Sequence, residues 1–201
     1  HGYAVQDPES RAYVAGPELI RMAVAVVRDL DLRSVAQPVM REMVDLLEET
    51  VHVSVLQGAE ILFVESIESR KSLRIGTRTG QKMPAHATAA GKVLLAWLDQ
   101  ERRRSLYPGA GLAARTAATI TSRRELEAQL EAVRAQGYAV NIGESEDEVS
   151  SVAVPVVDAR GRVRAALALA APRSRLDPAD APRIARTLAD GAAAIGELLP
   201  V

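Results

Sequence analysis

The chain has 201 residues, of which 48% are hydrophobic and 25% charged, and its formal net charge at pH 7 is −1. This composition is that of an ordinary globular protein of one or two domains, and the near-neutral charge argues against a nucleic-acid-binding surface in this chain. With 3% aromatic residues and no cysteine, an aromatic platform for bases, a disulfide framework and thiolate metal sites are excluded, and with no membrane-length apolar run or signal peptide we expect a cytoplasmic protein without a membrane partner.

The first predicted elements are a hairpin and two helices. Tyrosines and valines on both sides of Asp7-Pro8-Glu9-Ser10 predict a short β-hairpin. Pro17 at a helix start, followed by apolar residues at helical spacing, predicts a helix over residues 17–30. A second helix is expected after "DLDL" (29–32) and runs to about Thr50, with Pro38 within its first turns or at a kink.

Strand signals come next along the chain. Two β-rich runs around Gln57-Gly58-Ala59-Glu60 predict a hairpin, and "SLRIGT" (72–77) predicts a third strand. The stretch "QKMPAHATAAGKVLLAWL" (81–98) predicts a loop and then a helix, continued by "DQERRRSLYP" (99–108).

The last third of the chain predicts helix, strand, hairpin and helix. Ser122 with Glu125 forms a capping box for a helix that ends at Gly137. The strand "YAVNIG" (138–143) and a hairpin that turns at residues 158–161 follow, and a final helix has Asp177 as its N-cap and Pro178 as its first residue. The whole pattern predicts an α/β (α+β) fold with a mostly antiparallel sheet flanked by helices.

No catalytic or metal-binding motif is recognisable. "GAGLAA" (109–114) fits a dinucleotide fingerprint in letters but not in context, and "AAGK" lacks the glycine that a phosphate-binding loop needs. His1, His52 and His86 lie on separate elements without ligand spacing. The carboxylates of "GESEDE" (143–148) are best interpreted as an exposed acidic loop. We therefore expect no enzyme activity, no cofactor and no metal site.

Residues 81–98 raise a specific question, because a core helix begins there with unusually small residues. Ala89, Ala90 and Gly91 keep its first turn free of bulky side chains, and Thr88 or His86 is placed to cap it. The first N–H groups of a helix lack internal partners and lie at the positive end of its dipole, so a carboxylate could approach them. The alternative, which the residues alone favour, is that small residues only let the helix pack closely on the sheet.

Two long stretches resemble the IclR family of bacterial transcriptional regulators. They are "GTRTGQKMPAHATAAGKVLLAWL" (76–98) and "GYAVNIGESEDEVSSVAVPVVDARGRVRAALALAAP" (137–172), and the runs 50–69 and "SRLDPAD" (174–180) match as well. The resemblance implies a GAF-like effector-binding domain, joined by a linker helix to an N-terminal winged helix-turn-helix. It also implies homodimers or tetramers that bind operator DNA, with a small organic or aromatic carboxylate as the effector that controls a catabolic operon.

The same resemblance divides the chain into three parts. Residues 1–16 match the wing of the winged helix-turn-helix, 17–30 the linker helix, and 31–201 the effector-binding domain. The chain begins without methionine, and the recognition helices are expected upstream of His1. Arg11, in the wing, is a candidate contact to the phosphates of DNA, although an exposed turn arginine is an equal alternative.

The family's pocket positions can be carried over residue by residue. The resemblance implies effector contacts, polar or apolar, at Ala89, Ala90, Asn141, Ser151, Ala168, Ala170, Ile75, Met83 and Val149. Family members that bind small acids can have an acidic residue in place of Asn141 and hydroxyls in place of Ala168 and Ala170. These departures indicate an effector larger or more apolar than a two-carbon acid.

In this interpretation the effector shifts the balance between two arrangements of the dimer, and the linker helix relays the change to the DNA-binding domains. Two alternatives stay open. One is a stand-alone sensor or dimerisation module, and the other is an enzyme acting on a small acid through His86, Thr88 and the acidic loop.

Overall fold

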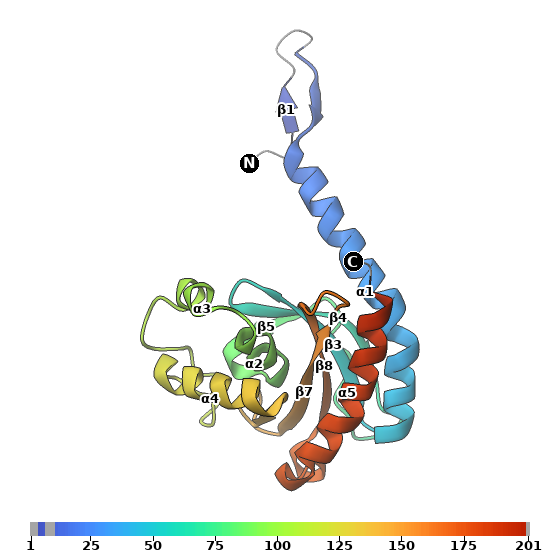
Figure 1. Ribbon diagram of the computed structural model, residues 1–201, viewed down its shortest axis with the longest axis vertical. Helices are drawn as coiled ribbons and strands as arrows, with labels where there is room; N and C mark the ends of the chain where they lie inside the picture. The colour runs from blue at the N-terminus through green and yellow to red at the C-terminus, as the bar shows by residue number, and fades with distance from the viewer. Residues whose placement is uncertain (1–3, 7–10, 200–201) are drawn as a thin grey trace.

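The computed structural model describes residues 4–6 and 11–199, with the backbone alone for residues 15, 17 and 19–31. Strands β1 (Ala4–Gln6) and β2 (Tyr13–Ala15) pair antiparallel and confirm the predicted hairpin, whose turn lies outside the described residues. The break expected at residues 29–32 is wrong, because one helix, α1, runs from Pro17 to Leu47 with Pro38 inside it. Those four residues include neither glycine nor proline, so nothing in them ends a helix. Figure 1 shows α1 leading from the hairpin to the sheet.

A six-stranded sheet in the order β5-β4-β3-β8-β7-β6 forms the centre of the molecule, and every neighbouring pair is antiparallel. The strands are β3 (Thr50–Gln57), β4 (Glu60–Ile67), β5 (Lys82–Pro84), β6 (Ala139–Ile142), β7 (Val149–Val157) and β8 (Val163–Pro172). Both predicted hairpins, β3–β4 and β7–β8, are confirmed, as are the short strand β6 and the antiparallel α+β arrangement.

The strand predicted at residues 72–77 is wrong. The strand that pairs with β4 at this edge of the sheet is β5 instead. Side chains, rather than a neighbouring strand, bond the backbone of this segment. Glu68 accepts from the N–H of Thr77 at 2.8 Å, and Thr50 donates to the carbonyl of Ile75 at 2.6 Å. Its alternating sequence therefore ends up in a loop held by polar anchors.

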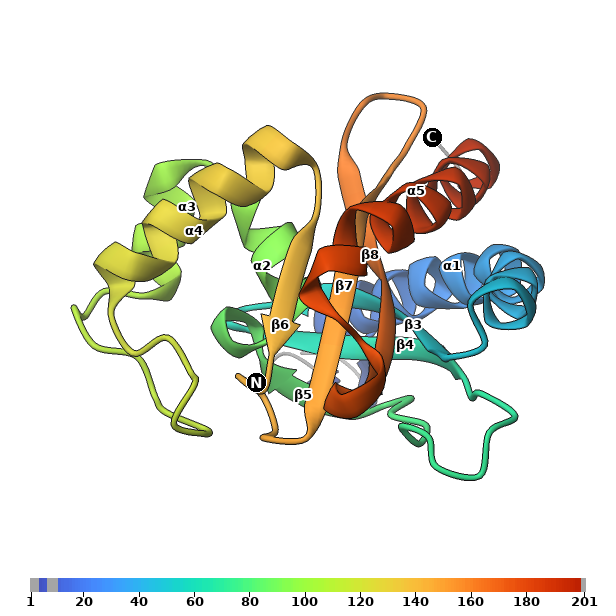
Figure 2. The ribbon, with the colours of Figure 1, turned by 90° about the horizontal axis from the view of Figure 1, so that it is seen from below.

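Helices cover both faces of the sheet, as Figure 2 shows. α2 (Ala89–Ala96), α3 (Gln100–Leu106) and α4 (Arg123–Gln136) lie on one side, and α1 and α5 (Ala181–Leu198) lie on the other. Three 3₁₀ turns, η1 (Ala85–Ala87), η2 (Arg173–Arg175) and η3 (Pro178–Asp180), complete the described elements. None of the described helices is long and apolar enough to cross a bilayer.

Some predicted helix ends differ from the observed ones. Ser122 occupies the N-cap of α4, but its side chain makes no capping hydrogen bond, so the capping box is wrong. Gly137 ends α4 in the left-handed conformation as predicted, with φ 84°. Asp177 caps the turn η3 rather than α5 itself, and α3 is a separate helix that begins after Asp99, whose carboxylate accepts from the N–H of Arg102 at 2.6 Å.

The two faces of the sheet carry side chains of different size. On β8, Leu167 and Leu169 belong to the core shared with α1 and α5, whereas Ala166 and Ala168 belong to the core shared with α2 and α4. Small side chains on the α2 face let that helix lie close to the strands. The start of α2 and the middle of β3 and β8 are thereby brought together.

Candidate functional site

The start of α2 has the backbone arrangement that its sequence predicted. Thr88 is the N-cap, and its hydroxyl accepts a hydrogen bond from the N–H of Gly91 at 3.0 Å. The carbonyl of Thr88 accepts from the N–H of Lys92 at 2.9 Å. The N–H groups of Ala89 and Ala90 precede this first helical bond, so the helix itself offers them no acceptor. They are the donors available to an anion.

Gly91 is small for a separate reason. A Cβ atom at this position would overlap the backbone of Ala85, because η1 crosses directly beneath the first turn of α2. The alternative derived from sequence, close packing, therefore holds for Gly91. Ala89 and Ala90 are buried in the core on this face as well, and they also line a cavity.

This cavity, which we call the α2 cavity, lies between the start of α2 and the sheet and has a volume of about 30 Å³. Eight of the nine residues carried over from the family line it: Met83, Ala89, Ala90, Asn141, Val149, Ser151, Ala168 and Ala170. The ninth, Ile75, does not line it and lies in the loop after β4, where its carbonyl is bonded to Thr50. The family resemblance implied an effector contact at Ile75, and the cavity lining does not include it.

Asn141 has a structural task at this site. Its amide group donates to the carbonyl of Ala87 at 3.1 Å and to the hydroxyl of Ser145 at 3.0 Å, and its oxygen accepts from the N–H of Glu144 at 2.8 Å. Both amide hydrogens are thus engaged within the protein. Asn141 holds η1 and the loop after β6 together at the edge of the α2 cavity.

The loop "GESEDE" is not simply an exposed acidic loop, and that expectation is wrong for its first half. Glu144 and Ser145 are buried, and a carboxylate oxygen of Glu144 lies 2.6 Å from the ammonium nitrogen of Lys92. Burial lowers the pKa of Lys92, and the carboxylate of Glu144 opposes that shift. No cluster of three or more metal-ligating side chains exists in the part of the chain that the structure describes.

Six lining residues were not among the nine positions carried over from the family: His52, Ile61, Phe63, Arg78, Thr88 and Ser145. Arg78 forms a two-bonded ion pair with Glu146, with N–O distances of 2.8 and 3.0 Å, and lies 3.5 Å from the sulfur of Met83. It therefore joins the loop before β5 to the acidic loop beside the cavity. The alternation of β3 could have placed His52 on the α2 face, but no spacing links it to Arg78.

His86, in contrast, does not line the α2 cavity. Its Nε2 lies 2.9 Å from the carbonyl oxygen of Ala113, and its ring contacts the ring of Tyr107 edge-on. The hydroxyl of Thr88 is committed to the helix cap. His86 and Thr88 are therefore not arranged as a catalytic base and nucleophile on a shared substrate site.

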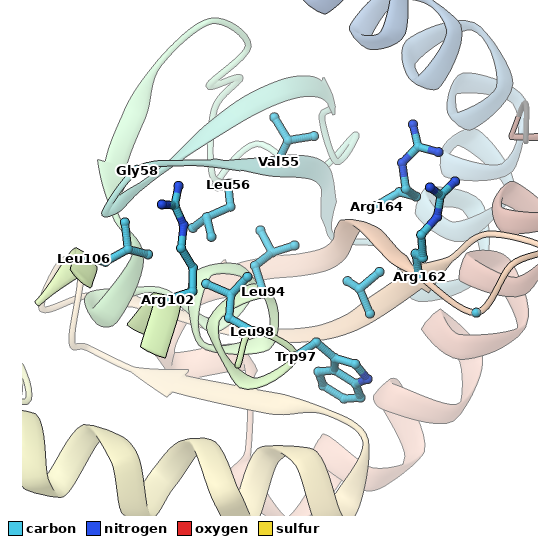
Figure 3. Close-up of a pocket in the computed structure, with 12 residues that line it drawn as sticks. Val55, Leu56, Gly58, Leu94, Trp97, Leu98, Arg102, Leu106, Arg162 and Arg164 are labelled. Atoms are coloured by element: carbon cyan, nitrogen blue, oxygen red, sulfur yellow. The ribbon is translucent and has the colours of Figure 1, made fainter. Parts of the chain in front are cut away.

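A second hollow, of about 600 Å³, lies at the opposite end of α2 (Figure 3). Leu94, Trp97 and Leu98 line it, with Arg102 on one side and the pair Arg162 and Arg164 on the other. Both arginines of that pair are bonded to Asp158, at 2.8 and 3.2 Å. The positive end of α2 is at the α2 cavity and not here, so the larger hollow is the weaker candidate for an anion.

Arg11 lies two residues before the start of β2 and is exposed. Its φ is 56°, and its carbonyl accepts a hydrogen bond from the amide of Gln6 at 3.0 Å. Its contact to DNA stays a prediction.

Comparison with known proteins places these features in context. The family model described as the C-terminal domain of the bacterial transcriptional regulator IclR matches residues 24–197. The chain is 38% identical over 180 residues to the HTH-type transcriptional regulator XynR of Escherichia coli, covering 90% of this chain and 71% of XynR. It is 37% identical over 174 residues to KdgR of Dickeya chrysanthemi, covering 87% of this chain and 57% of KdgR. The chain thus spans little more than half of the latter relative.

Solved structures show the same architecture. The C-terminal domain of E. coli KdgR superposes with a TM-score of 0.75 at 32% identity, covering 84% of this chain and 98% of that one. A double mutant of the inducer-binding domain of PobR from Acinetobacter, in complex with 3-hydroxybenzoic acid, gives 0.76 at 30% identity, with coverages of 82% and 97%. An IclR homologue from Microbacterium hydrocarbonoxydans, in complex with 4-hydroxybenzoate, gives 0.78 at 25% identity, with coverages of 98% and 80%.

Proposed function

The chain belongs to the IclR family of bacterial transcriptional regulators, and we propose that it is the effector-sensing part of a ligand-responsive regulator whose effector is a small organic or aromatic carboxylate. One observation carries the proposal: Ala89 and Ala90, whose N–H groups have no acceptor within the helix, line a cavity whose other walls are mostly apolar. An anion binds well at such a helix start, and an apolar body fits the remaining walls.

The lining of the α2 cavity supports an effector with an apolar part. Ile61, Phe63, Met83 and Val149 contribute large apolar side chains, and Ala168 and Ala170 leave room over the sheet. Two structural neighbours were solved with hydroxybenzoates, which have this combination of carboxylate and apolar ring. We propose the same chemical class for this chain, within small organic acids generally.

Binding of such a molecule requires side chains to move. A volume of about 30 Å³ has room for a water molecule and not for a benzoate. Arg78 and Met83 are the natural candidates to move, because they contact each other and Arg78 is held by the partly exposed Glu146. Effector binding would thus displace the loop before β5.

That loop is linked to α1 through Glu65, which gives the effector a route to the linker helix. Glu65 accepts hydrogen bonds from Arg33 at 2.6 Å and from Gln37 at 2.7 Å, both on α1. Its other oxygen accepts from the hydroxyl of Thr79, the residue after Arg78, at 3.3 Å. A displacement of Arg78 would therefore bias how α1 is held, which is the differential contact that coupling requires.

The remaining parts of the proposal concern the whole regulator. We propose that it is a cytoplasmic homodimer or tetramer, that it binds operator DNA through a winged helix-turn-helix encoded upstream of His1, and that it does not turn its ligand over. Reading the residues encoded upstream tests the DNA-binding part, because a helix-turn-helix pattern is expected there. Its absence would favour a stand-alone sensor.

The direct test of the sensing part is titration of the chain with acetate, glyoxylate, benzoate and hydroxybenzoates, followed by analysis of the recovered ligand. Binding of a benzoate-sized acid, recovered unchanged, supports the proposal. Exclusive binding of two-carbon acids would overturn the predicted size class, and chemical conversion of the ligand would favour an enzyme.

A further inference from the structure

His52 is a buried polar residue in the wall of the α2 cavity with an unused ring nitrogen. It lies in β3 directly opposite Ala168 of β8, and only 2% of its surface is exposed. Its Nδ1 is 2.8 Å from the hydroxyl oxygen of Ser66, across the β3–β4 pair. Its Nε2 is buried and has no hydrogen-bond partner among the residues that the structure describes. An unpaired buried polar atom is costly in a native protein and calls for an explanation.

We assign the tautomer of His52 from the hydrogen bonds around Ser66. The hydroxyl oxygen of Ser66 accepts from the backbone N–H of Arg78 at 3.1 Å. Donation of its own hydrogen to Nδ1 of His52, 2.8 Å away, gives that hydrogen an acceptor. Because a neutral imidazole has one donor and one acceptor, Nε2 carries the hydrogen.

The surroundings of His52 keep the ring neutral. Burial, and secondarily the positive charge of Arg78, lower the pKa of His52 to about 3. The ring also packs edge-on against Phe63, with 5.1 Å between the centroids. Near neutral pH, His52 is therefore an uncharged donor fixed between β4 and the α2 cavity.

The position of this donor separates it from the anion site. The N–H groups of Ala89 and Ala90 belong to the helix wall of the cavity, whereas His52, Ala168 and Ala170 belong to the sheet wall. The methyl groups of the two alanines offer His52 no acceptor. The partner of Nε2–H therefore has to come from the ligand or from water.

We infer that the Nε2–H of His52 donates a hydrogen bond to a second oxygen of the effector, a hydroxyl or carbonyl group distinct from the carboxylate bound at the start of α2. The effector is then a hydroxy- or oxo-substituted acid and not a plain one. This inference rests on the proposed function, because it assumes that the α2 cavity is the effector site. It makes His52 a specificity-determining residue, since a site that hydrogen-bonds a ligand oxygen rejects the analogue that lacks it.

Two substitutions of His52 distinguish the role of its Nδ1 from the role of its Nε2. In His52→Gln the side-chain amide reaches the position of Nε2 and keeps a donor there. In His52→Asn the shorter side chain can still bond Ser66 but places no donor at the position of Nε2. Both variants remove the titratable ring, so they serve as matched controls for each other, and circular dichroism with thermal melting checks that each is folded.

The experiment is calorimetric titration of wild type and both variants with paired acids that differ in oxygen content: 3- and 4-hydroxybenzoate against benzoate, and gluconate against hexanoate. Wild type is expected to prefer the oxygen-bearing member of a pair that it binds. His52→Asn should weaken the affinity for the oxygen-bearing acid about threefold to tenfold without changing the affinity for the other acid of the pair. His52→Gln should restore the preference.

The outcomes that overturn the inference are distinct from failure of the proposed function. If wild type binds an acid and His52→Asn keeps the same preference, His52 is not the donor, although the cavity is still the effector site. Equal loss in both variants would assign His52 a packing role only. If wild type binds none of these acids, the proposed effector class fails and this inference fails with it.

Discussion

The ammonium nitrogen of Lys92 lies 2.6 Å from a carboxylate oxygen of Glu144, and both side chains are buried. Lys92 belongs to the second turn of α2, and Glu144 belongs to the loop after β6. The ammonium group also bonds to Gln129 of α4 at 3.1 Å. The pair thus joins α2 to the loop after β6, and both elements contribute to the lining of the α2 cavity, through Ala89 and Ala90 of α2 and Ser145 of the loop.

Removing either Lys92 or Glu144 alone should lower the stability of the folded chain. Lys92→Met leaves the carboxylate of Glu144 buried without its counter-charge, so the free energy of unfolding should fall by about 3–5 kcal/mol. The double variant Lys92→Met with Glu144→Gln should recover part of this loss, because no charge is then buried. Urea denaturation of wild type, Lys92→Met, Glu144→Gln and the double variant measures the coupling energy between the two side chains. A loss below about 1 kcal/mol in Lys92→Met would show that the pair is solvated in solution.

Gly91 is predicted to be sensitive to a single methyl group. Gly91→Ala would force α2 away from Ala85 of η1, which should lower the free energy of unfolding by about 1–3 kcal/mol and weaken ligand binding at the displaced helix start. Gly109→Ala is the matched control, because its Cβ would meet only an oxygen of Gly111 at 3.9 Å. Chemical denaturation compares the two variants. Equal stability would mean that η1 does not lie beneath α2 as described.

The stability of the chain should depend on pH through His52. Its pKa falls from an ordinary value of 6.5 to about 3 on folding, mainly because of burial. Below pH 6.5 the unfolded chain therefore binds a proton that the folded chain does not, and the free energy of unfolding falls by about 1.4 kcal/mol per pH unit towards pH 3. Glu68 and Arg78 are the charged groups that act on the ring besides burial.

His52→Gln isolates this contribution, since carboxylates elsewhere in the chain titrate in the same range. The difference in unfolding free energy between wild type and His52→Gln should change by about 2–3 kcal/mol between pH 7 and pH 4.5. Urea denaturation at both pH values gives this difference. If it stays constant, His52 is not held neutral in the folded state.

Because Glu65 links the loop before β5 to α1, its substitution should weaken the coupling between ligand binding and α1 without weakening ligand binding itself. Glu65→Gln weakens the bonds to Arg33 and Gln37, so ligand affinity should stay within about threefold while ligand-induced changes in hydrogen exchange over residues 33–47 decrease. Glu127→Gln, which breaks an ion pair with Arg103 far from α1, is the control. An unchanged exchange response in Glu65→Gln would rule out this route.

Much of the fold could be predicted because local rules and tertiary packing agree. The hairpins follow from alternating β-rich runs, and the start of α2 follows from Thr88 with its small successors. The strand wrongly predicted at residues 72–77 has its origin in long-range contacts. The segment 72–77 alternates like a strand but is held as a loop by Thr50 and Glu68, which lie more than eight residues away from their partners.

The candidate site was predictable to the extent that small residues indicate open space. Ala89, Ala90, Ala168 and Ala170 could be identified by resemblance, and the structure places all four around one cavity. The alternation of β3 indicates the face of His52 but not its partners, and the role of Arg78 depends on the ion pair with Glu146. Neither relationship leaves a spacing in the sequence.

A thermal-shift comparison of an acid with its neutral amide tests whether a carboxylate binds at the start of α2, which is the claim on which the proposed function depends. Wild type should be stabilised by 4-hydroxybenzoate or another acid of this class, by about 2.7 kcal/mol at 100 times its dissociation constant, and the matching amide should have little effect. Ala168→Val, whose added methyl groups occupy the α2 cavity, should abolish the shift and remain folded. Equal stabilisation by acid and amide, or an undiminished shift in Ala168→Val, would contradict the claim.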